Sequence, residues 1–326
     1  MLNTGTIYGI NGPVIYLKGN TGFRMSEMVY VGKQKLVGEV IALDKDRTTS
    51  QVYEETTGLR PGEEVVASGN AVSVTLAPGI LNNIFDGIER PLERIAETGG
   101  AFITRGVSVD SLDREKKWKT HIVVEKGQYL HGGDIIAEVP ETHAILHKCM
   151  IPPDVEGTVK EGEYTIDETL VILELPDGGE KKLTMTQRWP IRVPRPTHHR
   201  FPASVPLVTG QRIIDTMFPI AKGGTAAIPG GFGTGKTMTQ HQIAKWADAD
   251  IIIYIGCGER GNEMTQVLEE FGELTDPRTG NPLMDRTTLI ANTSNMPVAA
   301  REASIYTGLT LAEYYRDMGY DVAIMY

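Results

Sequence analysis

One eight-residue run constrains this chain more than any other feature. Residues 230–237 read Gly-Gly-Phe-Gly-Thr-Gly-Lys-Thr, which fits the pattern G-x-x-x-x-G-K-[ST] at every fixed position. The apolar residues 226–228 before it predict a short strand, and residues 236–247 predict a helix. A glycine-rich turn in this setting lets successive backbone N–H groups point inward at a helix start, so the run predicts a phosphate-binding loop.

The side chains at the end of this run have the chemistry that a bound nucleotide requires. Lys236 is predicted to bridge the β- and γ-phosphates, and the hydroxyl of Thr237 is predicted to ligate Mg²⁺. The alternative interpretation is a glycine turn in front of an ordinary helix. The predicted nucleotide-binding residues are Gly230, Gly231, Phe232, Gly233, Thr234, Gly235, Lys236 and Thr237.

Strand-like and helix-like segments alternate after the loop. The run Ile-Ile-Ile-Tyr-Ile at 251–255 is typical of a buried parallel strand. Further helices are expected at 262–271 and 298–318, and strands at 288–291 and 322–325. This order predicts an α/β fold, with a parallel sheet and helices on its faces.

A carboxylate and a guanidinium follow the strand predicted at 251–255. The carboxyl ends of parallel strands carry the ligands of such sheets, so Glu259 and Arg260 are expected beside the phosphate loop. A carboxylate can orient and polarise an attacking water, and a guanidinium can stabilise charge on a γ-phosphate. Glu259, Lys236 and Arg260 are therefore the candidate catalytic residues, with Glu263 a weaker candidate. The alternative interpretation is that Glu259 and Arg260 only form a surface salt bridge at the end of the strand.

The chain ahead of the loop predicts two β-rich regions. Residues 1–78 contain short β-prone runs, such as 12–17 and 36–41, between turn residues, which favours a small barrel. A connector at 79–101 is expected to hold a helix at 80–95, with a kink at Pro91. A β-rich insertion is predicted at 102–187, and the domain that contains the phosphate loop is predicted at 188–326.

Three features of these regions have competing interpretations. The turn-then-strand rhythm of residues 126–139 resembles a lipoyl- or biotinyl-like barrel, but no Met-Lys-Met-like hairpin supports a swinging-arm carrier. His143, His147 and Cys149 are metal-like types, yet no fourth ligand is evident, which favours ordinary packing. The Pro- and Arg-rich residues 188–196 are interpreted as a solvated linker at a domain boundary rather than an anion site.

Composition limits the partners that can be expected. A net charge of −10 argues against a nucleic-acid coat or a polybasic membrane patch. Two cysteines are too few for a disulfide framework and suit a reducing compartment. No signal peptide or spanning segment is predicted, so a cytoplasmic location is expected, with any membrane role arising through partners.

Several motifs along the chain together resemble the catalytic A subunit of V/A-type rotary ATPases. The β-rich insertion distinguishes that subunit from the F-type β subunit. The resemblance rests on the phosphate loop and on the residues at 83–88, 209–215, 239–242, 256–264 and 292–302.

The resemblance implies a fold and a function. It implies an N-terminal β-barrel, an inserted bulge domain and a RecA-like P-loop domain that binds ATP or ADP with Mg²⁺. Glu259 would activate water, and Arg260 would contact phosphate. The resemblance further implies ATP hydrolysis or synthesis coupled to H⁺ or Na⁺ transport. The subunit would alternate with B subunits in an A3B3 ring, with an arginine finger from B, around a central rotor and beside a peripheral stalk and a membrane sector.

The chain departs from the family pattern at two places. Gly231 stands where the family usually has Pro. The sequence also stops at Tyr326, after the strand that normally leads to an acidic second-shell residue for Mg²⁺, so a fragment of such a subunit is expected. The alternatives are a non-catalytic ring component and another RecA-type hexameric motor, such as a secretion ATPase or an RNA translocase.

Overall fold

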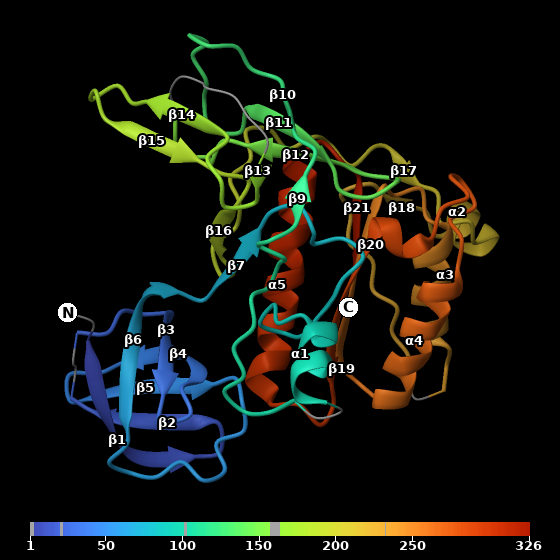
Figure 1. Ribbon diagram of the computed structural model, residues 1–326. Coiled ribbons are helices and arrows are strands. Elements are labelled where there is room, and N and C mark those ends of the chain that lie inside the picture. Colours follow the sequence, from blue (N-terminus) through green and yellow to red (C-terminus); the bar gives the residue numbers. More distant parts are fainter. Residues whose placement is uncertain (1–2, 20–21, 101–102, 157–163, 232) are drawn as a thin grey trace.

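The computed structural model describes residues 3–19, 22–100, 103–156, 164–231 and 233–326. A β-barrel, a β-rich insertion and an α/β part can be followed along the chain in Figure 1. Phe232, which belongs to the predicted phosphate loop, lies outside the described residues.

The first part of the chain is the predicted barrel. Its strands are β1 (Thr4–Asn11), β2 (Val14–Lys18), β3 (Glu27–Val31), β4 (Leu36–Leu43), β5 (Arg47–Val52) and β6 (Glu64–Ala71). They close in the order β1-β2-β5-β4-β3-β6, which leaves no open edge. Alternate side chains such as Ile15 and Leu17 fill the interior. The strand expected from residue 12 begins at Val14, because Gly12 has a φ of 57° in the turn before it.

The connector after the barrel differs from its prediction. It contains β7 (Ser73–Leu76), β8 (Ile84–Phe85) and α1 (Leu92–Gly99). The helix predicted over 80–95 is wrong, since β8 pairs in parallel with a strand of the central sheet. Asn82 and Glu89 also have φ values of 60° and 62°, which a right-handed helix excludes. Pro91 caps the start of α1 instead of kinking a longer helix, a place where its missing N–H costs nothing.

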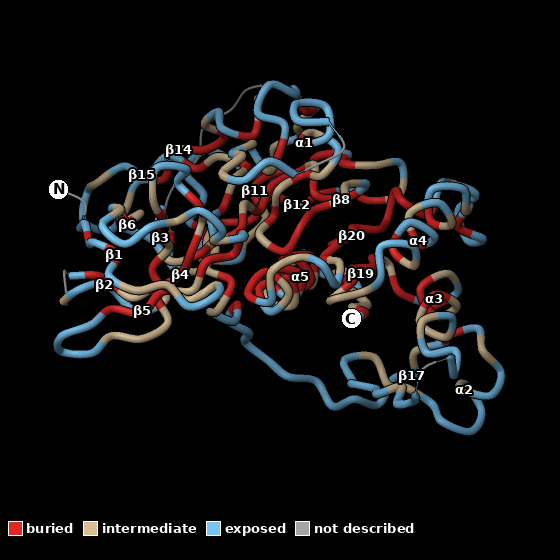
Figure 2. The backbone as a smooth tube through the Cα atoms, turned by 90° about the horizontal axis from the view of Figure 1, so that it is seen from below, coloured by how far each residue is buried: buried red, intermediate tan, exposed pale blue. Residues whose placement is uncertain are grey.

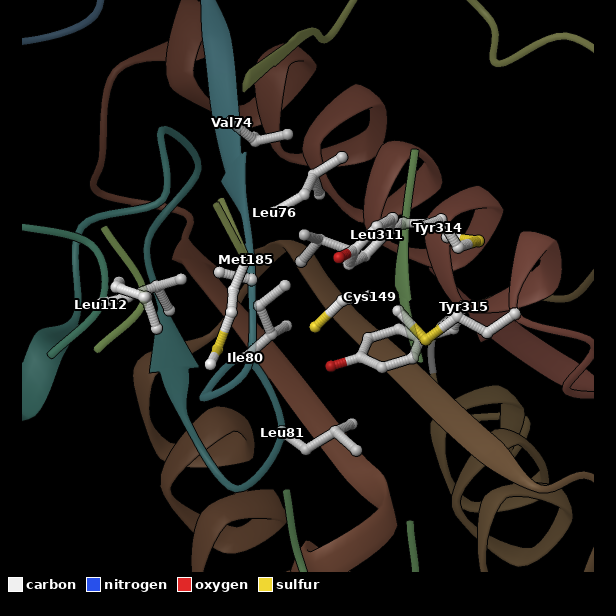
Figure 3. Packing of buried hydrophobic residues seen from close by; sticks show 14 of the residues in the cluster. Val74, Leu76, Ile80, Leu81, Leu112, Cys149, Met185, Leu311, Tyr314 and Tyr315 are labelled. Atoms are coloured by element: carbon white, nitrogen blue, oxygen red, sulfur yellow. The ribbon is translucent and has the colours of Figure 1, made fainter. Parts of the chain in front are cut away.

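The insertion consists of small antiparallel sheets. Its strands are β9 (Lys117–Trp118), β10 (His121–Ile122), β11 (Ile135–Pro140), β12 (Leu146–Met150), β13 (Tyr164–Thr165), β14 (Val171–Glu174) and β15 (Glu180–Leu183). They pair as β10-β11-β12, β13-β9 and β14-β15. Their apolar side chains share one core with the long helix α5 (Val298–Asp317), which Figure 3 shows around Cys149, Tyr314 and Tyr315.

The three residues with metal-like types have other partners in this insertion. His147 is buried between the carboxylate of Glu141 at 2.7 Å and the hydroxyl of Tyr314 at 3.0 Å. Cys149 is buried in the shared core, and His143 lies 3.2 Å from Asp285. Within the described ranges, no group of three or more His, Cys, Asp or Glu side chains could hold a metal ion.

The segment predicted as a solvated linker is buried in part. β16 (Gln187–Pro190) pairs with β7, and Arg195 is only 4% exposed. Arg195 pairs with Asp317 of α5 at 2.6 Å, while Arg192 pairs with Glu39 of the barrel at 2.6 Å. Both arginines form ion pairs with buried or half-buried carboxylates. The composition of the segment does not indicate these partners, because they lie far away in the sequence. The solvated-linker prediction is therefore wrong.

The last part contains the predicted parallel sheet and its helices. Its elements are β17 (Pro206–Leu207), α2 (Arg212–Met217), β18 (Ile220–Ala221), α3 (Lys236–Trp246), β19 (Ile251–Glu259), α4 (Gly261–Glu273), η1 (Leu283–Arg286), β20 (Thr287–Thr293), α5 and β21 (Val322–Met325). The sheet order is β21-β19-β20-β8, and every pairing in it is parallel. The predicted α/β fold is confirmed.

Strand β19 explains why the sheet needs helices on both faces. Ile251, Ile253 and Ile255 belong to the core that contains α5. Ile252 and Tyr254 belong to a second core with α3 and α4. Figure 2 shows β19 and β20 among these helices, with β20 buried.

The strand predicted at 226–228 is absent. These residues have no regular secondary structure, and no strand of the described chain pairs with them. Because a three-residue strand depends on its ladder hydrogen bonds, an apolar sequence alone does not make one. The phosphate loop therefore follows an irregular segment, although it opens α3 as predicted.

Candidate functional site

The loop before α3 has the backbone geometry of an anion cradle. Gly233 and Gly235 have φ values of 75° and 84°, a region that residues with a Cβ avoid. Gly235 is the N-cap of α3 and makes no side-chain cap hydrogen bond, so the first N–H groups of the helix receive no side-chain acceptor there. The hydroxyl of Thr234 donates to the carbonyl of Gly231 at 2.8 Å, which folds the loop on itself.

Lys236 and Thr237 begin helix α3 beside this cradle. Lys236 is exposed and Thr237 is half-buried, and neither side chain has a hydrogen bond or ion pair with another described residue. The first turn of α3 contains no acidic residue. The ammonium group and the uncapped N–H groups at the positive end of the helix thus have no ion-paired or hydrogen-bonded carboxylate among the described residues, an arrangement that suits phosphate.

The same residues can also hold a magnesium ion. Mg²⁺ keeps several of its waters and binds through one or two protein oxygens together with substrate phosphates. The unpaired hydroxyl of Thr237, next to the cradle, is such an oxygen. The residues therefore fit a magnesium nucleotide without an all-protein cage.

Glu259 and Arg260 lie at the carboxyl end of β19, as predicted. Glu259 ends the strand and is half-buried, while Arg260 is exposed and is the N-cap of α4. The backbone N–H of Ser294 donates to the carbonyl of Glu259 at 2.8 Å. Burial raises the pKa of Glu259 to about 7, with further increases from the hydrogen bond and the charge of Glu263. The positive charge of Lys236 lowers this pKa, so the two side chains interact electrostatically.

Two residues that the motif reasoning ranked low or passed over also lie here. Glu263, in the first turn of α4, hydrogen-bonds with Glu259. The sequence indicates this proximity only through spacing, since Glu259 and Glu263 are four residues apart across the end of a strand and the start of a helix. Arg301 of α5 packs against Gly258, and no local pattern in the sequence indicates this contact.

This arrangement can bind a polyphosphate and transfer a proton beside it. A carboxyl group with a pKa near neutrality is suited to act as a general base at physiological pH.

Among the described residues, no helix combines the length and the apolar character that a membrane span requires.

Sequence models of one protein family match the chain in three successive segments. The models describe the beta-barrel domain at residues 7–69, the barrel-sandwich domain at 109–192 and the nucleotide-binding domain at 210–326 of the ATP synthase alpha/beta family. The order of the three matches follows the barrel, the insertion and the α/β part.

Curated relatives are similar over almost the whole chain. The V-type ATP synthase alpha chain 2 of Clostridium tetani is 61% identical over 326 residues, which is 98% of this chain and 55% of that protein. The A subunit of the A-type ATP synthase of Methanopyrus kandleri is 58% identical over 325 residues, again 98% of this chain and 55% of the relative. The V-type ATP synthase alpha chain of Halothermothrix orenii is 57% identical, with the same shares. The chain thus spans about half the length of the curated relatives it matches.

Proposed function

Because the chain belongs to the ATP synthase alpha/beta family, we propose that it acts as the catalytic A subunit of a V/A-type rotary ATPase. The observation that carries the proposal is an unpaired Lys236 at an uncapped helix start, in electrostatic contact with a carboxyl group of pKa about 7. The proposed parts are a barrel at 1–78, a connector at 79–101, a bulge insertion at 102–187 and a nucleotide domain at 188–326.

ATP or ADP is the proposed ligand of the loop. The glycine backbone and the first N–H groups of α3 hold the phosphates, and Lys236 supplies the positive charge between the β- and γ-phosphates. Thr237 supplies a ligand to Mg²⁺, which when bound neutralises charge on the transferred phosphoryl group. Gly230, Gly231, Phe232, Gly233, Thr234 and Gly235 form the proposed cradle.

Glu259 is the proposed base for phosphoryl transfer to water. Its ionised carboxylate orients a water molecule for attack, and its pKa near neutrality lets it hold the proton that the water releases. Arg260 and Lys236 stabilise charge on the phosphate oxygens. In the synthesis direction the same groups return the proton and bind inorganic phosphate beside ADP.

The proposed coupling to ion transport follows from the relatives, whose names describe V-type and A-type ATP synthases. H⁺ or Na⁺ is moved by a membrane sector that other chains form. The proposed partners are the B subunit in an alternating A3B3 ring, the central rotor stalk and the peripheral stalk, and the location is the cytoplasmic face of a membrane.

The role of Glu259 is tested by Glu259→Gln in the full-length subunit within its assembled complex. We expect ATP hydrolysis to fall about 100-fold or more, because general-base catalysis contributes about 10² to 10⁴ in rate. Nucleotide affinity should stay within about threefold, since the loop is untouched. Glu269→Gln, an exposed carboxylate on α4, is the matched control. Turnover that survives Glu259→Gln would remove Glu259 from the mechanism.

The role of Lys236 is tested by Lys236→Met and by measuring ADP and ATP affinity calorimetrically. We expect the affinity to fall at least about tenfold, which corresponds to about 1.4 kcal/mol. Lys245→Met is the control on the same helix, because Lys245 already pairs with Glu270 at 2.9 Å. Equal affinities of the two variants would contradict the proposed phosphate cradle.

A further inference from the structure

We propose that Arg301 is a positioning residue that fixes the direction of the Glu259 side chain. This inference deepens the proposed function and rests on it. Arg301 stands in the first turn of α5, and it contacts the turn from β19 to α4 both directly and through the loop between β20 and α5.

Arg301 packs directly against the residue before Glu259. A Cβ built on Gly258 would lie 3.0 Å from Cδ of Arg301 and 3.6 Å from its Nε and Nη1. Gly258 also has a φ of 79°, so it is glycine for two independent reasons. The arginine stem therefore occupies the space that any other residue at this turn would need.

Hydrogen bonds extend this contact on either side of Gly258. The Nη2 group of Arg301 donates to the carbonyl of Ser294 at 2.7 Å, and the N–H of Ser294 donates to the carbonyl of Glu259 at 2.8 Å. The carbonyl of Arg301 accepts from the thiol of Cys257 at 3.4 Å. The side chain of Arg301 thus holds Gly258 directly and Glu259 through Ser294, while its backbone carbonyl holds Cys257.

The strand pairing is irregular at the same place. β19 and β20 pair in steady register up to Cys257 and Asn292, and the register shifts before Glu259 meets Thr293. Such an irregularity redirects the side chains that follow it, and it is common beside active sites. Arg301 bonds to the loop at 294–296, on the β20 side of this shift, through the carbonyls of Ser294 and Met296.

Arg301 lacks the complete set of hydrogen bonds that would be expected if it served only to stabilise the fold. Its Nε is buried without a hydrogen-bond partner, and no carboxylate in the described part of the chain pairs with it. A buried donor left unpaired costs stability. The contacts of Arg301 thus fix the geometry of the turn at a cost in stability.

A change at Arg301 is therefore expected to affect the rate of ATP hydrolysis without affecting nucleotide affinity. These contacts of Arg301 go to the turn and the loop, not to the phosphate cradle. Removing its guanidinium should let the turn relax and misplace the Glu259 carboxylate. A displacement of about 1 Å can cost about 10²-fold in rate.

The test compares Arg301→Met, Arg301→Lys and the control Arg316→Met in the full-length subunit within its assembled complex. Arg316 lies on the same helix in a half-buried ion pair with Asp317 at 2.6 Å. For Arg301→Met we expect kcat to fall about 10- to 100-fold, nucleotide affinity to stay within about threefold, and the acidic limb of the pH profile to move. Arg301→Lys should recover part of kcat, and it carries the test if Arg301→Met does not assemble.

A double variant separates positioning from general damage. When Glu259→Gln has already removed the base, Arg301→Met should lower the residual turnover by less than about twofold. A full additional loss in the double variant, or a weakening of nucleotide affinity by about tenfold or more, would overturn the positioning role. If Glu259→Gln by itself leaves turnover intact, the proposed role of Glu259 fails instead, whatever Arg301 does.

Discussion

At the residue scale, Glu263 influences the ionisation of Glu259. They lie four positions apart across the junction of β19 and α4, and they hydrogen-bond with one another. Burial and the neighbouring carboxylate raise the pKa of Glu259 to about 7, so near neutral pH the carboxyl group exists in both protonation states. A base must be ionised to accept a proton, and kcat/KM of the free enzyme should therefore rise with pH through about 7.

The pairing predicts the effect of Glu263→Gln. Glu263 raises the pKa of Glu259, so removing its charge should lower that pKa and move the acidic limb of kcat/KM to lower pH. The measurement is ATP hydrolysis by the assembled complex at pH values from about 5 to about 9. Glu269→Gln should leave the limb in place. A limb that stays or moves upward for Glu263→Gln would show that Glu263 does not control the ionisation of Glu259.

At the element scale, the insertion is joined to α5 by a buried polar network. Glu141 accepts the backbone N–H groups of Gly79 at 2.8 Å and Leu81 at 3.0 Å, and it also bonds to His147 and the hydroxyl of Tyr315. Burial opposes the charge on Glu141, but the charge and hydrogen bond of His147 and the two N–H groups outweigh it, so its pKa is lowered. The network links the connector, β12 and α5 in one place.

The network predicts that His147→Ala strongly destabilises the fold. Removing one partner leaves the buried carboxylate of Glu141 without its main compensating group, which costs about 3–5 kcal/mol in comparable buried pairs. The measurement is thermal or urea unfolding of the 326-residue chain. His131→Ala is the control, because the His131 side chain is 70% exposed and lies 3.8 Å from Asp134. Equal unfolding midpoints would show that the network contributes nothing to stability.

The lowered pKa of Glu141 also fixes the direction of a pH dependence. A carboxyl group with a depressed folded pKa contributes stability above its unfolded pKa, here about 4.5, and loses it as pH falls towards the folded value. The destabilisation by His147→Ala should therefore be largest near neutral pH and should shrink on acidification below about 4.5.

At the scale of the whole molecule, the segment at 201–221, which contains α2 and the paired strands β17 and β18, carries several exposed apolar side chains. Phe201 is 87% exposed, Ile213 64%, Met217 66% and Phe218 70%. Figure 1 shows this segment beside α3, and in Figure 2 it is largely exposed. Large apolar side chains exposed along one segment promote association in water.

These exposed side chains predict self-association of the 326-residue chain when it is studied alone. Phe201→Ser combined with Phe218→Ser should reduce light scattering and the binding of a hydrophobic dye. Tyr129→Ser, at a side chain 56% exposed in the insertion, is the control and should change neither signal. A chain that scatters no more light than the double variant would contradict the prediction.

The sequence by itself determined the elements whose information is local. The phosphate loop is a contiguous run, and glycine at 233 and 235 meets a backbone requirement within that run. The apolar run of β19 likewise predicts its own element, because a continuous β-branched run suits a strand that is buried on both faces. The barrel, the insertion and the parallel sheet were predictable for this reason.

The tertiary structure decided everything that depends on a distant partner. Ile84 and Phe85 form a strand because β20 offers a ladder, whereas residues 226–228 have a strand-like sequence and no ladder. The burial of Arg195 depends on its ion pair with Asp317, which lies 122 positions later in the chain. Arg301 likewise packs against Gly258, from which it is 43 positions away. Hydrogen bonds and ion pairs form between groups that the fold brings together, and a local pattern contains no record of those partners.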